Sequence, residues 1–384
     1  MNYHDPAMSY ERGDHVYLVT TTIRTPVFLN DVFANALKHR HAIPHCLVIG
    51  DRKTPREAAA FCARLAARYH GDVRYYPLDE QRRQLAQRPE LFKLMPLNHG
   101  SRKMIGNFIA YREGCSSLIM LDDDNFVINN DFFAAHSIVD ATRKILTVSA
   151  KSGWHNIAGA VREKNGVLFF PRGYPWAQRH AKPDPFKMSQ SRIRSVVNNG
   201  LVLGDPDIDA ISRLFWPIEV IGIRKPFRPN FALRPGTWCS FNNQNTALAR
   251  VAVPVYFTPP ATQRNADIWT SFVLCKLAGH MGDAITFGEP LVRQIRNPHD
   301  LWDDLEQERV NNKATDRFVA ILRSVRLKSG DYQTALQELL DACLAALAAH
   351  AHDWPEDASQ MMFDFFKQYK IWLRLFKNLP SIGR

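Results

Sequence analysis

The sequence predicts an α/β fold in which a mostly parallel sheet is flanked by helices and followed by a C-terminal helical extension. Three observations predict it. Apolar, β-branched runs alternate with helical patterns over the first 125 residues, polar clusters follow the ends of three of these runs, and the pattern from about residue 312 is mostly helical.

The N-terminal elements follow in order. Buried strands are expected at 16–23, 45–50, 72–76 and 116–125, and helices at 28–39, 54–69 and 100–114. Thr54 is expected to cap the second helix, with Pro55 in its first turn. The carboxyl ends of parallel strands share one edge, where ligands bind, so three polar clusters should converge there: Thr21 to Arg24, Asp51-Arg52 and Asp122 to Asp124.

The rest of the chain predicts a different organisation. The stretch 150–265 is rich in Pro, Gly, Asn and aromatic residues, which indicates short strands and long loops, with helical periodicity only at about 207–215. A helix is expected at 267–280, and the helical end of the chain is broken at Pro355. We therefore expect a catalytic domain over 1–310 and a helical extension over 311–384.

Composition narrows the partners and the compartment. The 384 residues carry a net charge of +11, which favours a phosphate-bearing partner, although solubility alone also explains it. The six cysteines form no CxxC pair, which favours buried free thiols in a reducing compartment. No signal peptide or membrane-spanning run is seen, so a cytoplasmic protein is expected, either free or peripheral on the inner face of a membrane.

The strongest motif is Leu-Asp-Asp-Asp-Asn at 121–125. Adjacent carboxylates repel one another, and a hard divalent cation such as Mg²⁺ or Mn²⁺ would relieve that repulsion. Asp122 and Asp124 are the candidate metal ligands, with His299 as a third, although a lone histidine is more often structural. The alternative is a solvated acidic turn or a helix N-cap.

Four further positions are candidate site residues. Arg102 and Lys103 lie at a helix start, where an anion would offset the helix dipole; a solvated basic face explains them equally well. Arg172, in Phe-Pro-Arg-Gly-Tyr-Pro-Trp, suits a phosphate or sugar, or belongs to an ordinary aromatic loop. Asp267 is either a helix cap or a general base.

A run of carboxamides adds a polar segment. Asn243 lies among Asn242, Gln244 and Asn245, and this density of donors and acceptors suits a hydroxyl-rich ligand, while the alternative is a simple turn. Thr22 and Asp123, from the polar clusters at two strand ends, complete the set of residues that we expect at this ligand-binding edge.

These motifs, taken in order, resemble a known group. The ordered set resembles the reversibly glycosylated polypeptides, whose plant members are UDP-arabinopyranose mutases, and equally the related STELLO proteins. The motifs that carry the resemblance are TTIR at 21–24, LVIGD ending at 51, LDDDN, FPRGYPW, NNGLVLGDPDIDA, the GTW segment, NADIW and RNPH. The resemblance covers roughly residues 16–308. It implies a GT-A glycosyltransferase fold with a UDP-sugar site at the strand ends.

The resemblance also implies roles for individual residues. Asp51 would contact the uracil, Arg24 and Arg102 would lie near the nucleotide, and Asp122 to Asp124 would form the metal and diphosphate motif. Arg172 matches the arginine that is glycosylated in the mutases, and Asp267 matches an acidic residue near the reacting sugar. The chain departs from the mutases at 291–294, where Leu-Val-Arg-Gln replaces a Trp-His-Ser segment.

The expected activity is therefore metal-dependent transfer of a sugar from a UDP-sugar to a glycan or glycolipid acceptor, as in building a bacterial surface polysaccharide. The alternative is a UDP-sugar pyranose/furanose mutase, which Arg172 favours. A protonated guanidinium is nevertheless a poor nucleophile. A nucleic-acid-binding protein is not expected, because no DNA or RNA motif accompanies the positive charge.

The last helix carries apolar residues on one face and basic residues on another. Met362, Phe365, Phe366, Tyr369 and Trp372 share the apolar face, and this pattern over 361–378 is typical of a helix lying on an anionic membrane. The alternative is that the apolar face docks on the core or on a second subunit, so homo-oligomerisation is left open.

Overall fold

The computed structural model describes residues 15–180, 185–298, 300–350, 354–377 and 379. A twelve-stranded sheet runs through this part of the chain, with the order β3-β2-β1-β4-β11-β8-β6-β10-β12-β5, while β7 and β9 pair beside β8. Helices flank the sheet, and three long helices follow the last strand. The predicted fold class is confirmed.

The N-terminal strands form the parallel part of the sheet. Hydrogen-bonded registers β3-β2, β2-β1 and β1-β4 are all parallel, as the alternation of strands and helices predicts. The elements are β1 (Val16–Thr22), α1 (Leu29–Lys38), β2 (His45–Gly50), α2 (Glu57–Tyr69), β3 (Val73–Tyr76), α3 (Leu78–Gln84), α4 (Pro89–Leu94), α5 (Lys103–Arg112) and β4 (Ser117–Leu121).

Thr54 differs from the prediction. No side chain caps α2, and Arg56 stands at its N-cap position. The Thr54 hydroxyl instead donates to the Thr22 carbonyl and accepts from the Asp51 amide. Thr54 therefore connects the ends of β1 and β2, which is where the polar clusters converge.

The second half of the sheet is mixed. β11 joins β4 in an antiparallel register, β8 and β6 pair antiparallel, and β12 runs parallel to β8. The elements are β5 (Asn125–Val127), α6 (Phe132–His136), β6 (Thr142–Ala150), β7 (Val161–Glu163), α7 (Trp176–Arg179), β8 (Phe186–Gly204), α8 (Ala210–Phe215), β9 (Val220–Ile223), β10 (Asn230–Leu233), β11 (Asn245–Ala249), α9 (Ala266–Met281) and β12 (Ala284–Gln294).

The expectation of only short strands over 150–265 is wrong for β8, which has 19 residues. Its first half is largely exposed, including the apolar Phe186 and Met188, and the buried residues lie over 195–202. A strand of this kind lacks both the continuous apolar run of a buried strand and a regular alternation, so its sequence resembles a loop.

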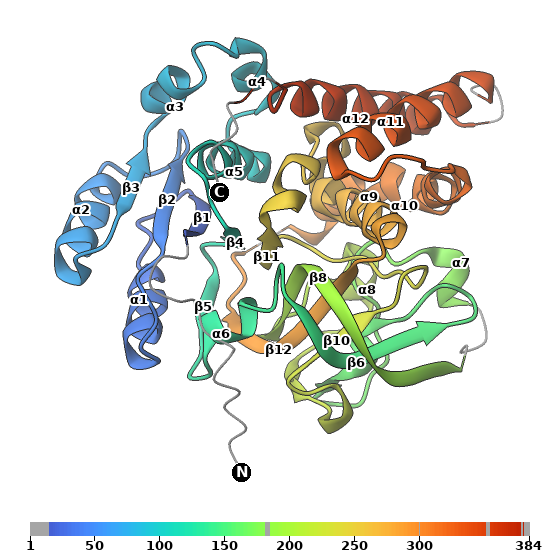
Figure 1. Cartoon of the computed structure of the whole chain (residues 1–384), viewed down its shortest axis with the longest axis horizontal. Coiled ribbons are helices and arrows are strands. Elements are labelled where there is room, and N and C mark those ends of the chain that lie inside the picture. The colour runs from blue at the N-terminus through green and yellow to red at the C-terminus, as the bar shows by residue number, and fades with distance from the viewer. Residues whose placement is uncertain (1–14, 181–184, 299, 351–353, 378, 380–384) are drawn as a thin grey trace.

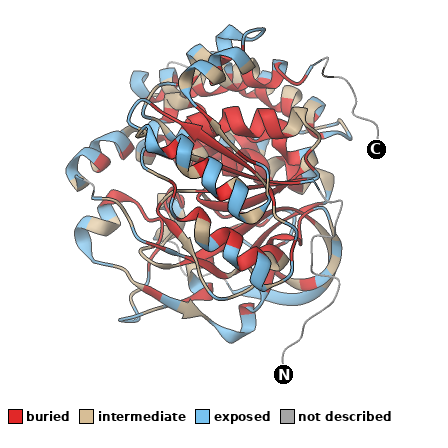
Figure 2. Cartoon of the chain, turned by 90° about the vertical axis from the view of Figure 1, so that its left-hand side faces the viewer, coloured by how far each residue is buried: buried red, intermediate tan, exposed pale blue. Residues whose placement is uncertain are grey.

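The C-terminal helices pack on the sheet domain beside α9 (Figure 1). They are α10 (Leu301–Ser324), α11 (Tyr332–Ala349) and α12 (Glu356–Arg374), which begins directly after Pro355 as predicted. Figure 2 shows the buried residues concentrated along the sheet and the inward faces of the helices. All six cysteines are free and buried.

The membrane contact expected through 361–378 is corrected by the packing of α12. The Trp372 ring stacks on Phe257 with centroids 5.0 Å apart, and its indole N–H donates to the Pro254 carbonyl at 2.9 Å. Tyr369 and Phe365 are also fully buried. The apolar face is thus covered by the chain's own core, and the docking alternative holds. Within the described residues, no helix is long and apolar enough to cross a membrane.

Candidate active site

The three consecutive carboxylates stand where β4 leaves the sheet. The Asp122 amide donates to the Gln244 carbonyl at 2.9 Å, and the chain then turns, with the Asn125 amide donating back to the Asp122 carbonyl at 3.2 Å. This turn gives each carboxylate a different set of partners.

Asp122 faces Lys103. The Lys103 ammonium contacts Asp122 Oδ1 and also lies 3.2 Å from the Asn243 carbonyl oxygen. The Lys103 side chain is only 1% exposed, while that of Asp122 is 38% exposed. Asp122 is thus an anchored carboxylate with one side open to a ligand.

Asp123 points back toward the end of β1. Its Oδ2 accepts from the Thr22 hydroxyl at 2.7 Å and from the Ile23 amide at 3.4 Å, and Arg24 Nε lies 4.0 Å away. Arg24 in turn donates to the side chain of Asn297. Thr22, Arg24 and Asp123, all predicted site residues, therefore form one polar turn beside the other two carboxylates.

Asp124 is a buried carboxylate whose pKa is raised. Burial, and then the charges of Asp122 and Asp123, raise its pKa to about 6. Gln294, at the end of β12, hydrogen-bonds its carboxylate and is itself held by Gln244 at 2.7 Å. The surroundings of Asp124 therefore disfavour its ionised form.

The predicted metal set is only partly visible. Within the described residues no group of three His, Cys, Asp or Glu side chains is arranged to hold a metal ion. His299, the candidate third ligand, lies outside the described residues. Asp122 and Asp124 stand together as two carboxylates at one strand end.

A second charged cluster centres on Arg172. Its guanidinium makes a two-point contact with Asp207, with Nε and Nη2 donating over 2.8 and 2.9 Å, and Nη2 lies 3.4 Å from Asp267. Burial favours the neutral guanidine, but the two carboxylates outweigh it and raise the pKa of Arg172. Arg172 is therefore held permanently as a cation.

Gly173 explains how Arg172 reaches this position. Its φ is +72°, and a Cβ added there would lie 2.1 Å from Ile268 Cγ2. Only glycine allows the loop to pass this close to the first turn of α9. The close approach sets Arg172 beside Asp267, which also lies in that turn.

The pKa values of Asp267 and Asp207 are shifted in opposite directions. Burial raises the pKa of Asp267, which accepts from the Asn243 amide at 3.3 Å. Burial also acts to raise the pKa of Asp207, but the charge of Arg172 outweighs it and holds that pKa well below its usual range. Asp267 is thus the more basic carboxylate of the pair.

Asn243 joins the two clusters. Its amide donates to Asp267, and its carbonyl accepts from Lys103, which contacts Asp122. Five candidate site residues named from the sequence therefore form one contact network: Asp122, Lys103, Asn243, Asp267 and Arg172.

Asp207 and Asn242 are the members that sequence reasoning missed as site residues. Asn242 Nδ2 donates to Asp207 at 3.1 Å. The available signal was the spacing of Asp205, Asp207 and Asp209 after a β-branched run.

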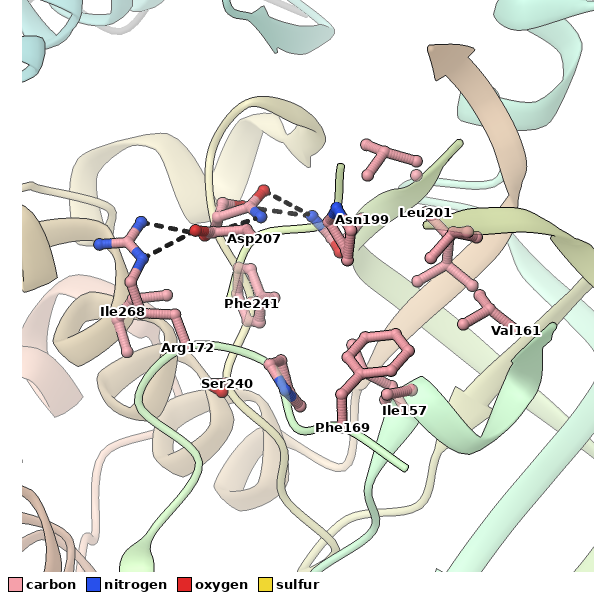
Figure 3. Close-up of a pocket in the computed structure, with 17 residues that line it drawn as sticks. Ile157, Val161, Phe169, Arg172, Asn199, Leu201, Asp207, Ser240, Phe241 and Ile268 are labelled. Atoms are coloured by element: carbon pink, nitrogen blue, oxygen red, sulfur yellow. Dashed lines mark hydrogen bonds and ion pairs between the residues drawn. The ribbon is translucent and has the colours of Figure 1, made fainter. Parts of the chain in front are cut away.

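A small cavity of about 60 Å³ adjoins Arg172 (Figure 3). Figure 3 shows the Arg172–Asp207 ion pair at one side of it and apolar side chains at the other, namely Ile157, Val161, Phe169 and Leu201. The second cluster therefore borders an amphipathic space.

Asp51, directly after β2, and Arg102, directly before α5, form a separate charged pair. Asp51 accepts from the Asn98 amide at 2.7 Å and from the Arg52 amide at 2.6 Å. Arg102 is fully buried, donates to the Met95 carbonyl at 3.0 Å and contacts Gln81. Its Nε is 3.9 Å from Asp51. The charge of Arg102 at the start of α5 is therefore offset by a carboxylate of the chain and not by the bound anion that the sequence suggested.

Comparisons with known proteins give a weak similarity. The sequence matches no protein-family model and no curated protein. Glucosyl-3-phosphoglycerate synthase from Mycobacterium tuberculosis, in complex with phosphoglyceric acid, shares 10% identity over 82% of this chain and 81% of its own, with a TM-score of 0.39. Its complex with Mn²⁺, UDP-glucose and phosphoglyceric acid gives 9%, the same coverage and 0.40. S. aureus TarS 1–349, in complex with UDP, shares 9% identity over 92% of this chain and 91% of its own, with a TM-score of 0.34.

Proposed function

We propose that the chain is a metal-dependent glycosyltransferase that moves a sugar from a UDP-sugar to a glycan or glycolipid acceptor. One observation carries the proposal. Asp122 and Asp124 stand together at a strand end, and Asp122 is joined through Lys103 and Asn243 to a buried carboxylate, Asp267, whose pKa is raised. A cation site beside a general base is the arrangement that such a transfer needs.

Asp122 and Asp124 would hold the cation. Both offer the oxygen ligands that Mg²⁺ and Mn²⁺ prefer, and the raised pKa of Asp124 marks a carboxylate that a cation would stabilise. When bound, the cation neutralises the charge of a diphosphate leaving group. Thr22, Arg24 and Asp123 shape the adjoining turn, and Asp51, directly after the neighbouring strand β2, would contact the uracil.

Asp267 would act as the base. An acceptor hydroxyl gives its proton to the Asp267 carboxylate while its oxygen bonds to the anomeric carbon. The bond from that carbon to the phosphate oxygen breaks, and UDP leaves with the electron pair. Burial makes Asp267 a stronger base than an exposed aspartate, and Asn243 fixes its orientation.

The geometry of Arg172 speaks against the mutase alternative. A glycosylated arginine requires a nucleophilic guanidine, which is neutral. Asp207 and Asp267 flank the Arg172 guanidinium and stabilise its charged form. We assign Arg172 the role of a positioning residue that fixes both carboxylates. A cytoplasmic location and a part in bacterial surface polysaccharide synthesis stay predictions.

The test is a panel of UDP-sugars incubated with the protein and Mn²⁺, with EDTA in parallel, followed by mass-resolved chromatography. We expect UDP release that depends on metal and is strongest with one sugar. Asp122→Asn and Asp124→Asn should abolish release, while Asp79→Asn, at an exposed position on α3, is the matched control. A new peak of unchanged mass without UDP would instead establish a mutase, and metal-independent release would contradict the proposed cation site.

A further inference from the structure

A second pocket of about 380 Å³ opens beside the candidate active site, between the β8–α8 loop and the start of α10. Arg213, Arg296 and Asp205 supply its charged groups, and Trp216, Ile218 and Leu301 supply apolar ones. None of these residues has a part in the mechanism proposed above.

The charged groups of this pocket are not balanced. Both arginines share one carboxylate: Arg296 Nε lies 2.8 Å from Asp205 Oδ2, and Arg213 contacts Asp205 Oδ1. The Arg213 side chain is only 10% exposed. Its Nε and Arg296 Nη2 are buried without a hydrogen-bond partner among the described residues. Two guanidinium N–H groups with net positive charge therefore lack an acceptor, which points to an anion.

Burial also opposes the charge of Arg213. It lowers the pKa of this guanidinium, the nearby charge of Arg296 lowers it further, and the carboxylates of Asp205 and Asp207 offset the two effects only in part. A bound anion would relieve both effects. A phosphate group offers several acceptor oxygens and suits convergent guanidinium groups.

The rim of the pocket is apolar and exposed. Phe215 is 83% exposed and Trp216 is 43% exposed, although both are large hydrophobic residues at the end of α8. Ile211 and Leu214 on the same short helix are exposed as well. Aromatic side chains that stand in solvent next to cationic groups are typical of surfaces that enter a membrane interface.

The pocket adjoins the candidate active site. Ile295, the residue before Arg296, donates its amide to the Asp124 carbonyl at 2.9 Å, and the charge of Arg296 favours the ionised forms of Asp124 and Asp207. The next residue, Asn297, accepts from Arg24, which faces Asp123. A ligand held by Arg213 and Arg296 would therefore present its attached group to the two carboxylate clusters.

We propose that this pocket binds the phosphate headgroup of a membrane lipid, while the α8 rim enters the bilayer interface. Resting on the proposed function, this names the acceptor class as a phosphorylated lipid. The arginines recognise the phosphate, and the exposed aromatic rim favours a lipid over a soluble phosphate ester.

The experiment is co-flotation of the full chain with phosphatidylcholine vesicles, with and without phosphatidic acid. We expect the wild type to float only with phosphatidic acid. Phe215→Ser combined with Trp216→Ser, and separately Arg213→Gln, should each weaken vesicle binding about tenfold or more. Leu37→Ser and Arg228→Gln, an exposed apolar and an exposed basic position elsewhere, are the matched controls and should float like the wild type.

Equal flotation with neutral vesicles, or wild-type flotation of the rim and arginine variants, would overturn the proposal. Binding of inorganic phosphate that Arg213→Gln removes, without any flotation, would also overturn it and would indicate a soluble phosphorylated acceptor. Binding of UDP with Mn²⁺ by the same wild-type preparation is measured in parallel. Flotation without UDP binding would contradict the proposed function and leave the lipid site standing.

Discussion

The three adjacent aspartates have different partners although their side chains are identical. Asp122 has a buried cation as partner, Asp123 has a hydroxyl and an amide, and Asp124 has the carboxamides of Asn125 and Gln294, with the charge of Arg296 acting on it as well. The sequence predicts that the three form a site. It does not reveal their separate roles, because Lys103, Thr22 and Gln294 come from three different elements.

Asp122→Asn and Asp124→Asn should both abolish activity but change stability in opposite directions. Removing the Asp122 charge leaves the buried Lys103 uncompensated and should destabilise the fold by on the order of 3 kcal/mol. Removing the Asp124 charge relieves a repulsion that raises its pKa to about 6 and should stabilise the metal-free protein by roughly 1 kcal/mol. Urea unfolding in EDTA measures both, and shifts in the same direction would contradict the assigned environments.

Asp267→Asn should slow sugar transfer by about 10²–10⁴-fold, because the amide cannot accept the acceptor's proton. UDP binding should change far less, since Asp267 contacts the Asn243 amide and Arg172 and not the three adjacent aspartates. Steady-state kinetics combined with calorimetric titration of UDP separates the two effects. Equal losses of transfer and of UDP binding would assign Asp267 to the donor site instead.

Arg102 shows where residue-scale prediction reaches its limit. The position of Arg102 at a helix start favours a phosphate, yet its guanidinium is covered by Gln81, Met95 and the nearby Asp51. Those partners come from separate segments that meet only in the folded chain. Arg172 was predictable for the converse reason, because its loop carries a glycine and prolines that mark a special backbone.

Helix α12 shows the same limit at the scale of an element. An apolar face flanked by lysines is compatible with a membrane or with a core, because periodicity alone does not identify what covers the face. Phe365 lies among Trp269, Phe318 and Tyr369, with ring centroids 5.3–5.6 Å away. Trp269 on α9 and Phe318 on α10 therefore decide that this face is covered by the core.

Phe365→Ala should therefore destabilise the protein by about 3–5 kcal/mol, since it opens a cavity among packed rings. Lys367→Ala, on the exposed side of the same helix, should change the free energy of unfolding by less than about 0.5 kcal/mol. Chemical denaturation of the two variants makes the comparison. A small effect of the phenylalanine replacement would argue that α12 is only loosely docked.

The division into domains 1–310 and 311–384 belongs to the scale of the whole molecule. Residue 310 lies within α10, and beyond it Thr315 accepts from the Trp269 indole at 3.0 Å while the Phe318 ring stacks on Trp269 at 4.0 Å. We expect one cooperative unfolding transition, with tryptophan fluorescence and circular dichroism coinciding. Two separate transitions would support an independent extension.

His136 predicts a pH dependence of the whole fold. It lies between Asn198 and Asn245, which satisfy both ring nitrogens of the neutral form, and burial lowers its pKa to about 4. The unfolded chain takes up a proton near pH 6.5, so the free energy of unfolding should fall as the pH drops from 6.5 toward 4, by up to roughly 3 kcal/mol. His136→Gln should flatten this slope in urea titrations, and parallel curves for variant and wild type would contradict it.

The six buried thiols can report local opening of the structure through their reactivity. Burial raises the pKa of Cys62, Cys115, Cys275 and Cys343 to about 12, so almost no thiolate exists near neutrality while the surrounding layers stay closed. A thiol reagent can modify each sulfur only during a transient exposure of its own layer. The order in which the cysteines are labelled would therefore report which parts of the sheet and of the C-terminal helices separate first.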